Sequence, residues 1–184
     1  MRMRPTPGWV PDNELQLAVD LIDEEFEELK LAIHRFDMIE VADAIADGMY
    51  VTSGLLLRLG LARTYINDLL REPIEPPTWI HFNPSIMGNL RDRHEQLFDA
   101  MWSRNLIDVD VTGHQLMYLL SELALMLRIP LMSTWAEVQR SNLAKLVDGK
   151  VIRHPQTNKI MKPTGWRAPD IAGVLSAHGW SAAA

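Results

Sequence analysis

Helix-type spacing of apolar residues recurs in this chain in two copies that lie 68 positions apart. Residues 27–59 align with residues 95–127 without a gap, and the agreement is densest at the end of each copy. There the motif Met-Tyr-x-x-Ser-x-Leu-x-Leu-x-Leu occupies residues 49–59 and again residues 117–127. Two amphipathic helical hairpins could share such a pattern by chance, but the clustered motif favours duplication. The repeat predicts an all-α helical bundle built from two tandem helical hairpins.

The periodicity and the capping signals place the expected elements. Asp12 or Asn13 is expected to cap the first helix, and Thr134 with Glu137 has the spacing of a capping box for the sixth. The expected helices cover residues 14–34, 38–59, 63–71, 87–104, 112–127 and 134–147. Beyond them, residues 150–154 and 159–162 are expected to form a small hairpin, and a short helix should run from Pro169-Asp170 to near Gly179.

We interpret residues 1–184 as a single domain, because this length is ordinary for one domain with a sizeable core. Its expected parts are an acidic, metal-binding repeat over 13–72, a proline-rich linker over 73–86, a degenerate second repeat over 87–147 and a substrate-covering tail over 148–184.

Composition narrows the class of protein. A net charge of −6 argues against nucleic-acid binding as the main activity. The chain has no cysteine, which excludes disulfides and thiolate metal sites and indicates nothing about secretion. No apolar run is long enough for a membrane span, so we expect no membrane partner and a cytoplasmic location.

Carboxylates gather on one face of each of the first two expected helices. Glu25 and Glu28 are three residues apart, and Glu40, Asp43 and Asp47 step by three and then four, so each set shares a helix face. Stacked carboxylates repel one another, and a hard divalent cation such as Mg2+ would offset that repulsion.

The alternative interpretation is an ordinary solvated face, because charged helix faces usually point to water. Two acidic faces on consecutive helices weaken that interpretation, since consecutive helices normally pack antiparallel and would bring the faces together. The six histidines include no pair at helical spacing, so oxygen-only ligation by Mg2+ or Mn2+ is favoured over iron or zinc.

The carboxylates do not recur in the second copy. At the offset of 68, the positions of Glu25, Glu28, Asp43 and Asp47 carry other residues, namely Arg93, Gln96, Val111 and Gln115. If the repeat is real, the second copy kept the packing and lost the charge, so the chain should hold one metal site.

Basic residues follow the acidic ones near the C-terminus. Arg140 and Lys145 lie at the end of an expected helix, with the amide side chain of Asn142 between them. Lys159, Lys162 and Arg167 follow in the sequence around Trp166. Basic groups beside an acidic metal site suit a polyphosphate substrate. The alternative is a solvated basic tail whose tryptophan only packs on the bundle.

Four motifs together resemble a known family. They are Glu24-Glu25-x-x-Glu28, Glu40-Val-Ala-Asp43-x-x-Ala-Asp47-x-x-Tyr50-Val-Thr-x-Gly54, Glu137-Val-x-Arg140-Ser-Asn142-Leu-x-Lys145 and Lys159-Ile-x-Lys162-Pro-x-Gly165-Trp166-x-x-Pro169-Asp170. In this order they resemble the all-α nucleoside triphosphate pyrophosphohydrolases, especially the small stand-alone MazG-like, phosphoribosyl-ATP-pyrophosphohydrolase-like proteins of bacteria and phages. The resemblance covers residues 15–62 and 134–172.

The resemblance implies Mg2+-dependent hydrolysis of a nucleoside triphosphate to the monophosphate and pyrophosphate. It implies metal ligands at Glu25, Glu28 and Asp47, and a water-orienting or catalytic role for Glu24 beside Glu25. It also implies that Arg140, Asn142, Lys145, Lys162 and Trp166 lie near the substrate. Relatives often carry Glu-x-x-Asp in the second helix, and here Ala44 stands in the glutamate position. Asp43 then supplies the missing carboxylate beside Asp47. Alternatively, Glu40 and Asp43 form the Glu-x-x-Asp pair, shifted by one helical turn.

Two other functions stay open at this point. One is phosphoribosyl-ATP pyrophosphohydrolase activity in histidine synthesis, and the other is a non-catalytic helical regulator that binds nucleotide. The resemblance also implies a dimer-like bundle. The internal repeat therefore predicts either a pseudo-dimeric monomer or a homodimer.

Overall fold

The computed structural model of the chain describes residues 5–61, 66–156 and 160–181. Within those ranges the fold is all-α, as predicted, with one two-stranded ribbon. The helices are α1 (Asp12–His34), α2 (Met38–Leu59), α3 (Ile66–Leu69), α4 (Ser85–Trp102), α5 (Leu106–Met126), α6 (Leu131–Leu143) and α7 (Ile171–Ala177), and the strands are β1 (Leu146–Val147) and β2 (Lys150–Val151).

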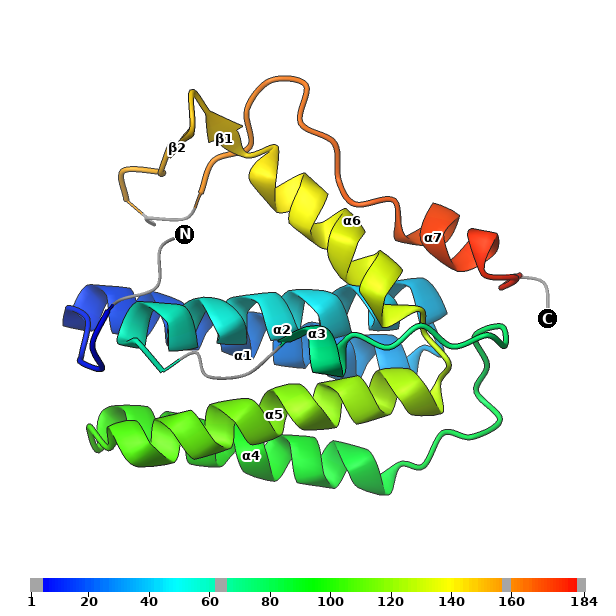
Figure 1. Cartoon of the computed structure of the whole chain (residues 1–184), viewed down its shortest axis with the longest axis horizontal. Helices are drawn as coiled ribbons and strands as arrows, with labels where there is room; N and C mark the ends of the chain where they lie inside the picture. The colour runs from blue at the N-terminus through cyan, green and yellow to red at the C-terminus, as the bar shows by residue number, and fades with distance from the viewer. Residues whose placement is uncertain (1–4, 62–65, 157–159, 182–184) are drawn as a thin grey trace.

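Two helical hairpins form the body of the molecule. Helices α1 and α2 make one hairpin, α4 and α5 make the other, and α2 packs against α5 between them. Helices α6 and α7 pack on α2, and Figure 1 shows them together with the β1–β2 ribbon on the side of the body away from α4. The two hairpins are therefore covered unequally, because the C-terminal part of the chain lies over the first one.

The two hairpins face each other across an approximate two-fold axis. Along the α2–α5 contact, a Cβ on Gly48 would touch Leu120, and a Cβ on Gly113 would touch Leu56. The contacts move up α2 as they move down α5, so these helices run antiparallel. Phe26 of α1 stacks on its own counterpart at the offset of 68, His94 of α4, with ring centroids 4.4 Å apart.

The connections between the paired helices also repeat at the same offset. Asp37 caps α2 by accepting hydrogen bonds from the backbone N–H groups of residues 39 and 40, at 3.1 and 3.2 Å. Asn105 caps α5 in the same way, at 3.1 and 3.2 Å. The residue before each cap, Phe36 or Arg104, adopts a positive φ of 55° or 57°. The sequence repeat is thus also a repeat of backbone geometry.

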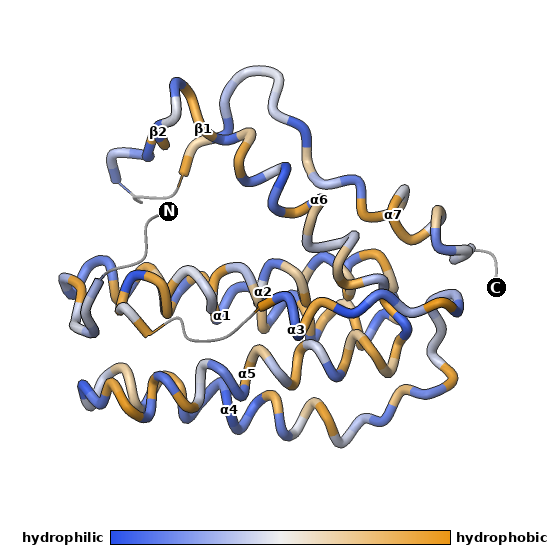
Figure 2. Tube along the Cα trace, in the orientation of Figure 1, coloured by the Kyte–Doolittle hydropathy of each residue, from blue (hydrophilic) through white to orange (hydrophobic). Residues whose placement is uncertain are grey.

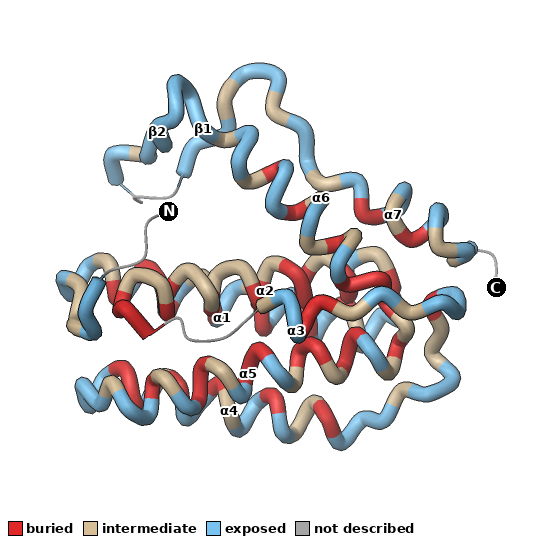
Figure 3. Tube along the Cα trace, in the orientation of Figure 1, coloured by how far each residue is buried: buried red, intermediate tan, exposed pale blue. Residues whose placement is uncertain are grey.

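Helix α2 lies at the centre because most of its circumference is apolar. Its buried residues include Val41, Ile45, Met49 and Leu55, each with 0% of its surface exposed. Figure 2 shows hydrophobic residues recurring along all four long helices, and Figure 3 shows buried residues where those helices face each other. Burying such side chains contributes about 1.5–3 kcal/mol each, so the hairpins are held together by this shared core.

Several expected boundaries were wrong. Helix α5 begins at Leu106, six residues before the expected start, because Asn105 supplies the cap. Helix α6 begins at Leu131 after Pro130 and ends at Leu143. Thr134 is therefore inside the helix, where its hydroxyl donates to the Pro130 carbonyl at 3.0 Å, and the expected capping box does not form.

Both ends of the chain also differ in detail from expectation. Helix α1 begins at Asp12 after Pro11, without a side-chain cap, so neither Asp12 nor Asn13 caps it. The ribbon pairs Leu146–Val147 with Lys150–Val151 around a turn at residues 148 and 149. The expected hairpin is present in part: Arg153 and Ile160 form an antiparallel bridge, and the backbone N–H of Met161 donates to the Ile152 carbonyl at 2.8 Å. Residues 157–159 lie outside the described part. In the described part of the chain, no helix is both long and apolar enough to cross a membrane.

The repeated caps give a prediction for stability. Replacing Asp37 with alanine should lower the free energy of unfolding by about 1 kcal/mol, because two backbone N–H groups at the start of α2 lose their acceptor. Asn105→Ala should have a similar effect at α5. Urea denaturation measures both changes. Glu95→Ala, at an exposed position inside α4, is the control and should change stability by less than about 0.5 kcal/mol. If both cap variants change the free energy of unfolding no more than this control does, the capping role of Asp37 and Asn105 is contradicted.

Candidate active site

The predicted carboxylates of α1 and α2 face each other across the first hairpin. Gly48 lies at the contact between the two helices, where an added Cβ would lie 3.9 Å from the Cβ of Glu25. The Asp47 carboxyl lies close enough to Glu25 for its charge to raise the pKa of Glu25. The antiparallel pairing expected from the sequence therefore gathers the two acidic faces.

Glu25 is the most strongly perturbed member of this cluster. Its pKa is raised to about 8, chiefly by burial and further by the neighbouring charges of Asp47, Glu28, Glu24 and Asp43. Glu24 and Glu28 themselves are more exposed than Glu25. The α1 side of the site is thus a half-buried carboxyl group with two solvent-reaching neighbours.

On α2, the structure places Asp43 inside the cluster and Glu40 at its edge. The pKa of Asp43 is raised to about 7, chiefly by burial and further by the charges of Asp47, Glu40 and Glu28, while Lys145 acts in the opposite direction. The Oδ1 atom of Asp43 is buried and has no hydrogen-bond partner among the residues described. Glu40 is exposed, one helical turn earlier. An orphaned carboxylate oxygen beside other carboxylates is an incomplete polar environment that a cation would complete.

Asp47 connects the carboxylates to helix α6. Burial raises its pKa, while the charge of Lys145 and a hydrogen bond from Asn142 act in the opposite direction. Lys145 also donates to the Oδ1 atom of Asn142 at 2.6 Å. Burial lowers the pKa of the Lys145 ammonium, and Asp47 opposes that shift. Asn142 and Lys145, predicted from the sequence as substrate contacts, therefore lie directly against the carboxylates.

Trp166 links the loop before α7 to the same region. Its indole ring has Lys162 on it at 4.3 Å and Lys145 at 5.5 Å, measured from each ammonium nitrogen to the ring centroid. Its Nε1 atom donates to the carbonyl of Ser141 at 2.9 Å, which fixes the ring on the end of α6. Two ammonium groups around one ring beside a group of carboxylates form a zone of mixed charge.

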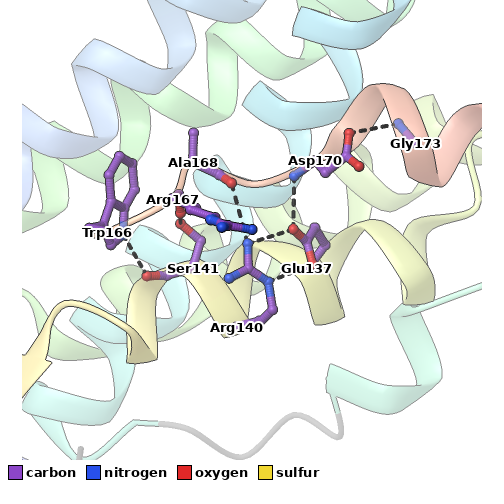
Figure 4. Close-up of polar contacts among 8 residues, drawn as sticks. All are labelled: Glu137, Arg140, Ser141, Trp166, Arg167, Ala168, Asp170 and Gly173. Carbon is purple, nitrogen blue, oxygen red and sulfur yellow. Dashed lines mark hydrogen bonds and ion pairs between the residues drawn. The ribbon is translucent and has the colours of Figure 1, made fainter.

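Arg140 lies in a separate contact that fastens the tail to α6 (Figure 4). Its guanidinium donates to both carboxylate oxygens of Glu137, at 2.7 and 2.8 Å, and to the Ala168 carbonyl at 3.3 Å. Glu137 also accepts the backbone N–H of Asp170 at 2.8 Å. Arg140 was predicted as a substrate contact; here it holds the tail, whereas Asn142 and Lys145 reach the carboxylates.

Two residues were missed by the sequence interpretation. Trp135 of α6 lies against Tyr50, with ring centroids 5.6 Å apart, and so seats α6 on α2 next to Asp47. Ser141 holds the tail through its carbonyl to Trp166 and through its hydroxyl, which donates to the Arg167 carbonyl at 3.2 Å. The Trp135 contact has no local sequence signal, because it joins residues from distant helices.

The donor set fits a hard divalent cation in its chemistry. The gathered groups are carboxylates from two helices with one amide oxygen nearby, and Mg2+ and Mn2+ prefer oxygen ligands. The orphaned Asp43 oxygen and the raised pKa values of Glu25 and Asp43 show negative charge that no cation in the cluster fully balances. Among the described residues, however, no three His, Asp or Glu side chains have the arrangement of a formed metal site.

One family model matches the chain, and it covers this hairpin. Residues 2–72 match the model of phosphoribosyl-ATP pyrophosphohydrolase. The match confirms the resemblance predicted from the sequence. The matched segment carries Glu24, Glu25, Glu28, Asp43 and Asp47, and the matching family is a member of the MazG-like all-α NTP pyrophosphohydrolase superfamily. The family implies pyrophosphohydrolase activity and is typically dependent on a divalent metal.

The match stops before α4. The tail residues Asn142, Lys145, Lys162 and Trp166 lie outside it, so their roles remain predictions. Searches among curated proteins and among solved structures gave no match for the chain.

The carboxylate cluster predicts a pH-dependent stability in metal-free buffer. Glu25 has an ordinary pKa of 4.5 when unfolded and about 8 when folded, so the folded state holds a proton that the unfolded chain has lost between those values. The free energy of unfolding should therefore fall as pH rises through that window. Melting temperatures in EDTA between about pH 5 and about pH 9 measure this effect.

Glu25→Gln provides the matched comparison. It should melt higher than the wild type at the alkaline end and show a shallower pH dependence, because the amide carries no charge to bury. Glu95→Gln, on the exposed face of α4, controls for the loss of one surface carboxylate. Parallel curves for wild type and Glu25→Gln would show that Glu25 does not titrate as described.

Proposed function

We propose that the chain is a Mg2+-dependent nucleoside triphosphate pyrophosphohydrolase, with Mn2+ as an alternative metal. It would hydrolyse a ribo- or deoxyribonucleoside triphosphate to the monophosphate and pyrophosphate, as part of cleaning the nucleotide pool in the cytoplasm. The observation that carries the proposal is the cluster of half-buried carboxylates on α1 and α2 within the family-matched segment.

The proposed metal ligands are Glu25, Glu28, Asp43 and Asp47, with Glu40 at the edge of the site. A bound divalent metal would supply charge neutralisation for the triphosphate and lower the pKa of a coordinated water. Glu25 or Glu24 is the proposed acceptor of the proton from the attacking water.

The tail is proposed to bind the phosphates. Lys145 and Lys162 flank Trp166 and lie beside the acidic cluster, where their ammonium groups can donate to phosphate oxygens. Asn142, already bonded to Asp47 and Lys145, would hold one phosphate or a ligand carboxylate in position. Arg140 would act through the tail anchor with Glu137. The chain would work as a pseudo-dimeric monomer, because α4 and α5 occupy the place of a second hairpin, although a homodimer of such units remains compatible with the site.

The family match favours a second candidate equally, phosphoribosyl-ATP pyrophosphohydrolase of histidine synthesis. Both reactions break the same α–β phosphoanhydride, so the two candidates differ only in the substrate. Pyrophosphate release should be measured with Mg2+ for a panel of ribo-, deoxyribo- and damaged triphosphates beside phosphoribosyl-ATP. Turnover of triphosphates alone supports the pool-cleaning function, and turnover of phosphoribosyl-ATP alone supports the histidine-synthesis function.

Single substitutions test the site for whichever substrate is turned over. Glu28→Gln and Asp47→Asn should each lower Mg2+-dependent pyrophosphate release by about 100-fold or more, because each removes a proposed metal ligand. Glu27→Gln is the matched control on α1, since Glu27 points away and pairs with Lys30 at 2.6 Å. Unchanged turnover in Glu28→Gln would refute the metal site. Nucleotide binding without turnover in the wild type would instead indicate a regulator.

A further inference from the structure

A groove lies between α4 and α5, in the hairpin that has lost the carboxylates. Its volume is about 800 Å3, and it is open to solvent. Helices α6 and α7 and the β1–β2 ribbon lie over the other hairpin, so the tail does not cover this face (Figure 1). The lining residues that matter here are Arg93, Gln96, Asp99, Trp102, Asp108 and Gln115.

This groove is the pseudo-symmetric counterpart of the candidate active site. The four positions equivalent to Glu25, Glu28, Asp43 and Asp47 are Arg93, Gln96, Val111 and Gln115, and all four line the groove. The second hairpin therefore has a groove at the positions equivalent to the site. A guanidinium, two amides and an apolar side chain stand where the first hairpin has its proposed metal ligands.

The replaced residues suit direct binding of a phosphate group. A guanidinium can bind a phosphate by two parallel hydrogen bonds without a metal. Arg93 donates one of its N–H groups to the Oε1 atom of Gln96, which orients the guanidinium at the position equivalent to Glu25. The amide of Gln115, at the position equivalent to Asp47, is a further donor and acceptor on the opposite helix.

The other groups in the groove limit the negative charge that a ligand can carry and favour a ligand with a nucleobase. The groove is lined by two carboxylates, Asp99 and Asp108, beside the one guanidinium of Arg93, so a triphosphate would meet more negative than positive charge. Asp108 accepts a hydrogen bond from Asn105 at 2.6 Å. Trp102 lines the same groove and is 51% exposed, and an exposed indole can stack on a nucleobase. One cation, paired amides and an aromatic ring fit a nucleoside with a single phosphate.

We propose that the α4–α5 groove binds a nucleoside monophosphate without a metal ion, as a second nucleotide site distinct from the carboxylate cluster. Arg93 would hold the phosphate, Gln96 and Gln115 would bond the nucleotide, and Trp102 would stack on the base. The proposed binding site does not depend on the proposed function. Only the further statement that its ligand is also the product of the enzyme rests on that function.

Titration calorimetry with AMP, GMP, CMP and UMP in EDTA tests the proposal on the full chain. At least one should bind the wild type, and Arg93→Ala and Trp102→Ala should each weaken that binding by about 10-fold or more. Arg91→Ala, at an exposed position of the same helix, is the matched control and should bind as the wild type does. Circular dichroism checks that each variant is folded.

Two further variants separate this site from the active site. Lys145→Ala and Glu28→Gln, both at the candidate active site, should bind the monophosphate in EDTA with the affinity of the wild type. Arg93→Ala should keep Mg2+-dependent turnover. No binding of any of the four monophosphates, or binding that falls with Lys145→Ala and not with Arg93→Ala, would overturn the proposal. If the wild type binds a monophosphate but releases no pyrophosphate from any substrate, only the proposed function is contradicted.

Discussion

The structure depends on holding carboxylates close together inside a helical bundle. Glu25, Asp43 and Asp47 are half-buried, and the pKa of each is raised chiefly by burial. Such an arrangement destabilises a metal-free fold, so it persists only because apolar packing elsewhere compensates. The compensation comes from α2, whose remaining circumference lies in the core between the two hairpins. The core thus offsets the cost of burying these carboxylates.

The second hairpin supplies the surface against which the first hairpin packs. Helices α4 and α5 repeat the turn geometry and the capping of α1 and α2, and they pack against the first hairpin about a pseudo-two-fold axis. They supply the apolar surface that α2 needs without adding a second group of carboxylates. The equivalent groove carries Arg93 and two glutamines at three of the positions that hold carboxylates in the first hairpin. The C-terminal part of the chain lies over the acidic hairpin, so the two halves differ in what covers them.

Helical spacing in the sequence predicted the features of the fold that depend on residues close together in the chain. The bounds of α2 followed from its periodicity, because Asp37 caps its start and Gly60, at a φ of 74°, ends it. The shared faces of Glu25, Glu28, Asp43 and Asp47 followed from helical spacing. The start of α5 was missed, because the residues from Leu106 to Val111 carry two aspartates that weakened the helical pattern. The tail anchor could not be predicted, since Glu137 and Asp170 meet only after α6 and α7 have packed.

Proton release on metal binding tests the central claim most directly. At pH 7, Glu25 and Asp43 should hold part of their protons in the metal-free protein, and a divalent cation must displace them. Titrating Mg2+ into the protein in two buffers of different ionisation enthalpy, such as Tris and PIPES, measures the protons released. The account predicts a buffer-dependent binding heat that disappears in Asp47→Asn together with the binding. Binding heats that are the same in both buffers, or unchanged in Asp47→Asn, would contradict it.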